Sequence, residues 1–361
     1  MADTPRPADK TRGATSAPRH RFAQHHSEAL DDGWGTLEAL YEDAQPLQTV
    51  VREISARSII SRNTSPDIGF EQSVNPYLGC EHGCIYCFAR PSHAYWDHNP
   101  GLDFETQLYA KAQAPELLRA AFNAAGYEPK PIALGINTDG WQPIEARLRI
   151  SRALLEVMVE YRHPVLIVTK SRLLERDIDL LADLARDGLV GVMISLTSLD
   201  PQIKRTLEPR AAGPQSRLAL IRALRAAGVP VGVLLAPVIP AVTDHEIEAL
   251  LEAAAEAGAE RASWVLLRLP HEVAPLFRDW LQAHYPQRAA HVMSLVQQMR
   301  GGRDYDASFH QRQRGTGVFA QLYQQRFDKA CRRLGLAQKR HSHFGLNTGA
   351  FRAPGQQHSL F

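Results

Sequence analysis

The chain has 361 residues, of which 44% are hydrophobic, and its formal net charge is only +2. This hydrophobic content is ample for a buried core, and the length suits one large domain or two modest ones. No stretch is apolar for long enough to be a membrane span or the core of a signal peptide, which argues against a membrane or secreted protein. The four cysteines suit a reducing compartment, and we therefore expect a cytoplasmic protein.

Basic residues gather toward the two ends of the chain. Residues 1–22 carry five Lys or Arg against two Asp, and residues 301–361 carry ten Lys or Arg against three Asp. The first stretch is also rich in Pro, Ser, Thr and Ala, which predicts a disordered arm. We expect a mostly disordered arm and lead-in (1–55), a central domain (56–300) and a basic C-terminal extension (301–361).

The next feature along the chain is a tight group of cysteines, Cys80, Cys84 and Cys87, spaced C-x3-C-x2-C. Three thiolates on one short loop can hold three irons of a [4Fe–4S] cluster and leave the fourth iron open. Glycines directly before the first two cysteines give the backbone the freedom to curl around a bulky inorganic group. The alternatives are a zinc site completed by His82, incidental burial of the thiols, and disulfide formation.

The surrounding run, NPYLGCEHGCIYCFAR at residues 75–90, resembles the cluster-binding loop of the radical S-adenosylmethionine (SAM) superfamily. More narrowly, it resembles the branch related to spore photoproduct lyase. The resemblance implies that SAM binds the open iron and that one electron from the cluster splits SAM into methionine and a 5′-deoxyadenosyl radical. It also implies a SAM contact at Tyr86 and a reductant such as flavodoxin or ferredoxin as a partner.

Short apolar runs alternate with helical stretches farther along the chain. We expect a first strand that ends at Cys80, followed by buried parallel strands at 132–136, 165–168, 190–194, 229–235 and 264–267. Helices with one apolar face are expected over 149–161, 173–186, 216–227 and 244–257, with Thr243 or Asp244 capping the last. Six strand–helix units predict an α/β fold, a partial (β/α)6 barrel of the TIM type, which the resemblance also implies.

In such barrels the reactive groups come from the carboxyl ends of the strands. Residues 137–145, NTDGWQPIE, resemble the TD-x-[YW]-QP-x-E element of the branch, which implies that Thr138 and Asp139 lie near the amino group of SAM. The alternative is a turn in which both side chains satisfy the local backbone. The resemblance likewise implies that Lys170 and Ser195, at the ends of the third and fourth strands, contact the carboxylate and ribose region of SAM. An exposed lysine is the alternative for Lys170.

Two later loops also resemble elements of the family. Residues 208–210 read EPR, and residues 237–244 form a PxIPxxND-type turn with Val-Thr in place of the usual apolar-Asn pair. We expect Arg210 to contact a ligand, because a guanidinium can grip a carboxylate through two parallel bonds. The prolines of the second loop stiffen it and need no further function.

One departure limits the resemblance. Spore photoproduct lyase carries a hydrogen-donor cysteine just before its Ser/Thr-Asp pair, where this chain has Gly135-Ile136-Asn137. The fourth cysteine, Cys331, falls in an amphipathic stretch, and we interpret it as a small buried hydrophobe. Repair of spore photoproduct itself is therefore not expected.

The basic extension intersperses aromatic residues and histidines among its arginines: Phe309, His310, Tyr323, Phe327, His341, His343 and Phe344. It either grips a nucleic acid by charge and stacking or closes the open side of the barrel with its aromatic residues facing inward. Two functions are consistent with the sequence. One is a radical SAM enzyme that takes a hydrogen atom from a substrate, with nucleic acid as the first candidate; the other is a non-enzymatic [4Fe–4S] electron-transfer or scaffold protein.

Overall fold

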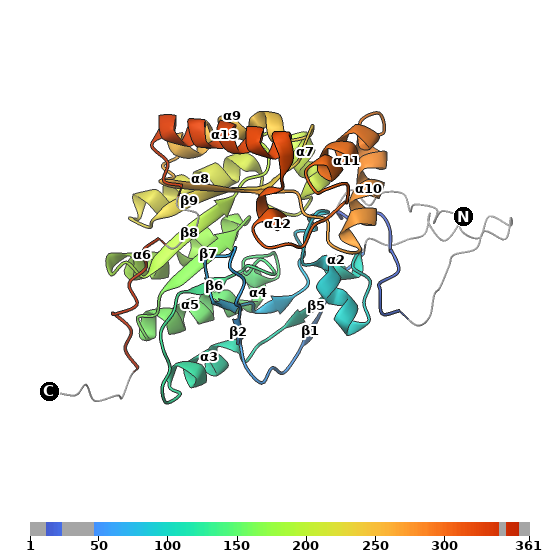
Figure 1. Cartoon of the computed structure of the whole chain (residues 1–361). Helices are drawn as coiled ribbons and strands as arrows, with labels where there is room; N and C mark the ends of the chain where they lie inside the picture. The colour runs from blue at the N-terminus through green and yellow to red at the C-terminus, as the bar shows by residue number, and fades with distance from the viewer. Residues whose placement is uncertain (1–11, 24–46, 339–343, 354–361) are drawn as a thin grey trace.

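The computed structural model describes residues 12–23, 47–338 and 344–353. At its centre is a curved seven-stranded sheet in the order β10-β9-β8-β7-β6-β3-β2, with helices packed along its outer side (Figure 1). The strands are β2 (Ile60–Arg62), β3 (Gln72–Val74), β6 (Ile132–Leu134), β7 (Val165–Thr169), β8 (Val190–Ser195), β9 (Val231–Val238) and β10 (Arg261–Leu266). Six of them run parallel, and β2 joins β3 in the antiparallel sense. The predicted partial barrel is confirmed.

The first parallel strand ends earlier than predicted. β3 stops at Val74 rather than at Cys80, and Tyr77–Leu78 form β4 of a second, three-stranded sheet. Pro76 lies between them and has no backbone N–H, so it cannot continue a ladder of hydrogen bonds. In the small sheet, β5 (Gln107–Ala110) pairs with β4 in the antiparallel sense and with β1 (Val50–Glu53) in the parallel sense. The cysteine loop therefore begins where the chain leaves this small sheet.

The four predicted helices are present with shifted starts. They are α5 (Ile150–Glu160), α6 (Ile178–Arg186), α8 (Pro214–Ala226) and α9 (Ile247–Glu256), and short 3-10 turns precede two of them, η2 (Arg172–Asp177) and η3 (Asp244–Glu246). The predicted cap is wrong: the Thr243 hydroxyl accepts a bond from the Ile239 N–H at 2.9 Å, and Asp244 accepts one from the Tyr323 hydroxyl at 3.0 Å. Thr243 is thus held by a bond within its own loop and Asp244 by a contact with α13, and neither side chain caps the helix.

Further helices surround these elements. They are η1 (Arg90–Trp96), α2 (Asp103–Thr106), α3 (Ala114–Phe122), α4 (Glu145–Leu148), α7 (Pro201–Leu207), α10 (Val273–His284), α11 (Ala289–Gln298), α12 (Gln311–Arg314) and α13 (Gly317–Leu334). Within the described ranges, no helix is both long and apolar enough to cross a membrane.

Part of the predicted N-terminal arm is packed against the domain, contrary to the expectation of disorder. The backbone N–H groups of Gly13 and Ala14 both donate to the Glu105 carboxylate at 2.9 Å. The Arg12 side chain donates to the Glu105 carbonyl at 3.0 Å. These contacts are between residues about 90 positions apart, so composition alone could not reveal them.

The C-terminal extension covers one side of the barrel. Figure 1 shows α13 lying beside α9, with α12 near the open edge of the sheet. Tyr323 and Phe327 are each 2% exposed, whereas Phe309 is 52% exposed. The inward-facing interpretation therefore holds for the two aromatic residues of α13 and not for Phe309. His341 and His343 lie outside the described residues.

Candidate functional site

A cavity of about 650 Å³ lies at the carboxyl ends of the central strands. Its lining brings the three cysteines together with strand-end residues of the barrel: Cys80, Cys84, Tyr86, Cys87, Thr138, Asp139, Lys170 and Ser195. Eight of the nine predicted site residues therefore share one cavity. Arg210 is the residue that the cavity wall does not include.

Two segments far apart in the sequence close one side of this cavity. Residues 65–70 and residues 310–314 both contribute to the wall. The Arg312 guanidinium donates to the Asp67 carboxylate with an Nε–Oδ2 distance of 2.6 Å. The basic extension thus completes the cavity from the side where the partial barrel is open.

The cysteine loop has a backbone that depends on glycine at two positions. Gly79 has a φ of 76° and Gly83 a φ of 68°, values that other residues rarely adopt. A Cβ atom at Gly79 would lie 2.5 Å from Leu108 Cδ2, and one at Gly83 would lie 2.8 Å from Glu105 Oε2. The loop is therefore wrapped closely against its support.

A buried ion pair supports the loop from behind. Arg90 donates from Nε to the Cys84 carbonyl at 2.9 Å and from Nη2 to the Gly83 carbonyl at 3.2 Å. The same guanidinium pairs with Glu105, and both side chains are fully buried. Arg90 is the last residue of the NPYLGCEHGCIYCFAR run, yet the sequence analysis gave it no function.

The raised pKa values of the buried thiols indicate that they need a nearby positive charge, such as a bound metal, to ionise. Burial raises the pKa of Cys84 to about 12 and holds the pKa of Cys80 well above its usual range. Buried thiolates need a nearby positive charge, which a bound metal supplies. Within the part of the chain that the structure describes, no three His, Cys, Asp or Glu side chains are close enough together to hold one ion. Three thiols on one loop suit an iron–sulfur cluster with one open iron, because thiolate sulfur is the ligand that such clusters prefer.

His82 faces a carboxylate rather than the thiols. Its Nδ1 lies 3.4 Å from Asp139 Oδ2, and its side chain is 3% exposed. Burial lowers the pKa of His82, an effect that the Asp139 charge partly offsets. This pairing further disfavours His82 as the fourth ligand of a zinc site.

The turn after β6 makes hydrogen bonds to neighbouring segments of the cavity wall. Asp139 accepts bonds from the Thr169 hydroxyl at 2.8 Å, the Lys170 N–H at 2.8 Å and the Trp141 N–H at 2.9 Å. The Thr138 hydroxyl donates to the Tyr77 carbonyl at 2.8 Å. Both interpretations from the sequence therefore describe part of the arrangement, because these side chains satisfy the backbone and also line the cavity.

Gln142, in the same turn, makes hydrogen bonds to the residues directly before and after Cys80. Its Nε2 donates to the Gly79 carbonyl at 3.1 Å, and its Oε1 accepts from the Glu81 N–H at 2.8 Å. The Gln142 side chain is fully buried, so solvent does not compete for these bonds. Cys80 lies between the two bridged residues, which means that Gln142 fixes its backbone.

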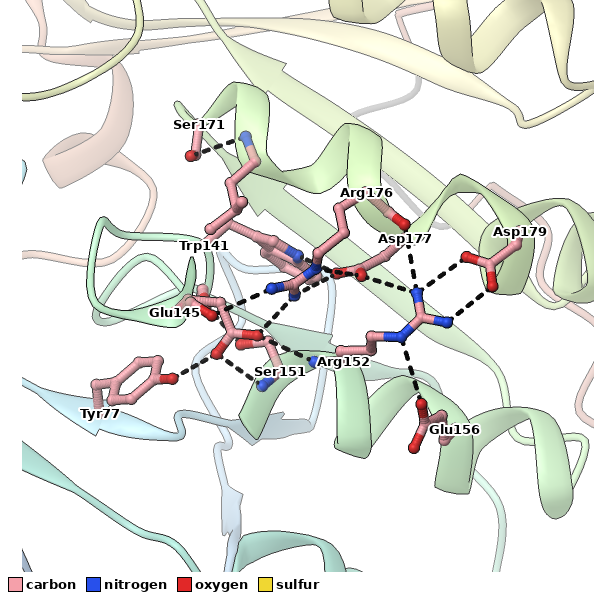
Figure 2. A network of polar contacts seen from close by, with 12 residues as sticks. Tyr77, Trp141, Glu145, Ser151, Arg152, Glu156, Ser171, Arg176, Asp177 and Asp179 are labelled. Carbon is pink, nitrogen blue, oxygen red and sulfur yellow. Dashed lines mark hydrogen bonds and ion pairs between the residues drawn. The ribbon is translucent and has the colours of Figure 1, made fainter. Parts of the chain in front are cut away.

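The end of the turn, Trp141 to Glu145, is anchored by a network of buried carboxylates (Figure 2). Glu145 accepts from the Ser151 N–H at 3.0 Å and from Arg176 at 2.8 Å, and it receives a short bond from the Tyr77 hydroxyl. A second carboxylate, Asp177, accepts from Trp141 Nε1 at 2.8 Å and also receives bonds from the Arg152 and Arg176 guanidinium groups. The network joins the small sheet, through Tyr77, to the outer helices.

Tyr86 belongs to a second buried network at the floor of the cavity. Its hydroxyl makes a short bond to Glu208, which also pairs with Arg217 and accepts from the Thr197 hydroxyl at 2.8 Å. Burial alone would raise the pKa of Glu208, but the charges of Arg217 and Lys170 lower it to about 2. Glu208, the first residue of the EPR element, therefore positions Tyr86.

Lys170 and Ser195 meet at the cavity wall, as expected for residues at neighbouring strand ends. Lys170 Nζ donates to Ser195 Oγ at 3.0 Å, and it lies 5.8 Å from the centre of the Tyr86 ring. The Lys170 side chain is therefore directed toward the cavity and not toward bulk solvent. An ammonium and a hydroxyl side by side can bind a carboxylate or a ribose oxygen.

Arg210 takes a different position from the one predicted. Its Nη2 pairs with Glu81 Oε1 at 3.0 Å, and its backbone N–H donates to the His82 carbonyl at 3.2 Å. Arg210 thus grips the cysteine loop from outside the cavity. In the structure the Arg210 guanidinium is paired with a carboxylate of the protein itself.

Cys331 is fully buried on α13 and does not line the cavity. Burial raises the pKa of its thiol to about 12. This agrees with the interpretation of Cys331 as a small buried hydrophobe.

Comparison with known proteins gives matches at the level of family and of fold. Residues 74–254, half of the chain, match the Radical SAM superfamily. An uncharacterized protein of Mycobacterium tuberculosis (strain ATCC 25618 / H37Rv) is 38% identical over 228 residues, which cover 63% of this chain and 67% of that protein. An uncharacterized protein of Methanocaldococcus jannaschii is 24% identical over 194 residues, which cover 54% of this chain and 70% of that protein.

Among solved structures, spore photoproduct lyase complexed with dinucleoside spore photoproduct is similar in fold. It matches with a TM-score of 0.54 and 14% identity, over 80% of this chain and 81% of that chain. At this identity the likeness shows the arrangement of the elements and nothing about the substrate.

Proposed function

The chain belongs to the radical SAM superfamily, and we propose on that premise that it is an enzyme that reductively cleaves SAM to abstract a hydrogen atom from a substrate. Cys80, Cys84 and Cys87 would hold the [4Fe–4S] cluster. When bound, the cluster and SAM supply an electron and a 5′-deoxyadenosyl radical, while the protein supplies position and a dry cavity.

One observation carries this proposal. The cysteine loop and the strand ends meet at a single cavity of about 650 Å³, a size typical of a site for a small molecule or cofactor. Lys170 and Ser195 offer a cation and a hydroxyl for SAM, and Tyr86 and the Thr138–Asp139 pair flank the same space. The apolar side chains of Leu166, Val168 and Leu234 also contribute to the wall of the cavity.

The alternative, an electron-transfer or scaffold protein, is less well supported. A protein that only carries electrons does not need a cavity with polar strand ends beside its cluster. It would also favour a closed set of four protein ligands, and Cys331 is buried on α13 outside the cavity wall. A Cys331→Ala variant is therefore expected to retain its full iron content.

Nucleic acid is the substrate class that we propose to test first. Phe309 is exposed on the basic extension, and the Arg312 guanidinium lies 5.0 Å from the centre of its ring. Spore photoproduct lyase, whose fold is similar, has been solved with a dinucleoside lesion. Because residues 135–137 include no cysteine, we expect a reaction other than repair of that lesion.

The decisive experiment is anaerobic reconstitution followed by addition of dithionite and SAM. We expect 5′-deoxyadenosine from the native protein and none from a variant in which Cys80, Cys84 and Cys87 are all alanine. Flavodoxin or ferredoxin should replace dithionite as the reductant. Native protein with about four irons per chain and bound SAM that forms no 5′-deoxyadenosine, with or without nucleic acid, would favour the electron-transfer alternative.

A further inference from the structure

The cations around the cavity differ in their bonding partners. Arg312 is paired with Asp67, and Lys170 is bonded to Ser195. Arg268 also lines the cavity, yet none of the carboxylates that the structure describes lies within 4.0 Å of its guanidinium. A positive charge at a cavity wall without a carboxylate partner is a candidate binding site for an anion.

Aromatic side chains hold the Arg268 guanidinium in place. Its central carbon lies 4.9 Å from the centre of the Phe88 ring and 5.9 Å from that of Tyr305, and its Nη2 donates to the Tyr305 hydroxyl at 3.3 Å. These contacts orient the guanidinium without neutralising its charge. Its Nε is buried and has no hydrogen-bond acceptor. A buried donor in this state is costly unless a ligand satisfies it.

A second guanidinium adds to the positive charge at the same place. Arg300 is 1% exposed, and its two terminal nitrogens donate to the carbonyls of Gln311 and Leu267 at 2.8 Å. Burial and the neighbouring charge of Arg268 lower the pKa of Arg300 to about 10. Arg300 thus holds the α12 segment beside the end of β10 and adds a second positive charge next to Arg268.

We propose that Arg268 binds an oxyanionic group of the substrate, a phosphate or a carboxylate, at the end of the cavity marked by Phe88 and α12. Two N–H groups of one guanidinium, including the unsatisfied Nε, match two oxygens of such a group. Phe88 directly follows Cys87, which places this site beside the cluster loop. That the anion belongs to a substrate depends on the proposed function, but the binding of the anion does not.

The test is equilibrium dialysis of radiolabelled inorganic phosphate, and in parallel of radiolabelled acetate, against the full chain saturated with SAM. Arg268→Gln removes the charge, and Arg268→Lys keeps the charge without the paired donors. Arg278→Gln is the matched control, because Arg278 is an exposed arginine paired with Asp304 outside the cavity. Dimethyl phosphate as a competitor distinguishes a phosphodiester from a phosphomonoester.

We expect one anion per chain, with affinity reduced roughly 10- to 100-fold in Arg268→Gln, less in Arg268→Lys, and unchanged in Arg278→Gln. Preference for phosphate or for acetate identifies the oxyanion. The proposal is overturned if the native protein binds neither anion, if Arg268→Gln binds as the native protein does, or if Arg278→Gln is weakened equally. Displacement of the anion by SAM would also overturn it, because Arg268 would then belong to the SAM site.

The variants must retain native far-ultraviolet circular dichroism, iron content and SAM binding for these results to be compared. If Arg268→Gln does not fold, Arg268→Lys provides a second substitution that keeps the positive charge. Anion binding without SAM cleavage would leave the Arg268 site in place and count against the proposed function alone.

Discussion

The two ends of the cavity are built differently. Around the cysteine loop, the arginines are paired with carboxylates, Arg90 with Glu105 and Arg210 with Glu81, and Gln142 bonds the backbone on both sides of Cys80. Near β10 and α12, Arg268 has aromatic neighbours and no carboxylate in the described structure within 4.0 Å. Cations that are paired with carboxylates suit the support of a group that is always bound, and a cation without a carboxylate partner suits a ligand that comes and goes. Substitutions should therefore cost stability at the first end and binding at the second.

The largest loss of stability is expected for Arg90→Met. This change leaves the Glu105 charge buried without its partner and removes the donors to the Gly83 and Cys84 carbonyls, at a cost of about 3–5 kcal/mol in unfolding free energy. Urea denaturation of the iron-free protein measures it. Arg278→Met, which breaks an exposed pair, should cost at most about 1 kcal/mol. Equal losses in the two variants would mean that the Arg90–Glu105 pair behind the cysteine loop stabilises the fold no more than an exposed ion pair does.

The next effect is a dependence of stability on pH at His93, which packs behind the loop. Burial lowers the pKa of His93 from 6.5 to about 4, so the folded state binds this proton less readily than the unfolded state. The folded state keeps its full stability above pH 6.5, where His93 is neutral in both states. As the pH falls from 6.5 toward 4, the free energy of unfolding decreases by an amount on the order of 3 kcal/mol. His93→Gln should flatten this part of the profile. His291→Gln, at an exposed position, should leave the profile unchanged.

A smaller effect is expected for Gln142→Ala. Loss of the bonds to the Gly79 carbonyl and the Glu81 N–H should cost about 1–3 kcal/mol and lower the iron retained after reconstitution. Iron and sulfide analysis after gel filtration measures the second effect. Gln298→Ala on the exposed surface is the control. Full iron content in Gln142→Ala would show that the bridge does not position Cys80 for the cluster.

The smallest effect on stability should come from Arg268→Gln. Because no carboxylate partner in the described structure is lost, we expect a change below about 1 kcal/mol in unfolding free energy. Thermal denaturation without added anion measures it. A loss as large as that of Arg90→Met would show that Arg268 supports the fold, and the contrast between the two ends of the cavity would fail.

Local patterns were enough to predict the barrel and to single out the cysteine loop at its cavity. The parallel strands are short apolar runs, and the cysteines lie within eight residues, so each signal is contained in a short stretch of sequence. The strand expected to end at Cys80 was the exception, because Pro76 divides it and the second piece pairs with β5.

The supporting contacts could not be predicted in this way. Glu105 meets Gly13 across 92 positions, Gln142 meets Glu81 across 61, and Arg210 meets Glu81 across 129. Which polar side chain meets which backbone group depends on the folded arrangement and not on spacing. The sequence predicted a ligand contact for Arg210, and its pairing with Glu81 of the cysteine loop could be found only in the structure.

The Asp67–Arg312 pair joins residues 245 positions apart, and this has a consequence for the order in which the protein is made. Cys87 leaves the ribosome 225 residues before Arg312 does. At typical rates of synthesis this interval lasts roughly 10–45 s. During that time the nascent chain already carries all three thiols but lacks the segment that closes the cavity. The segment that closes the cavity is therefore among the last parts of the domain to be made.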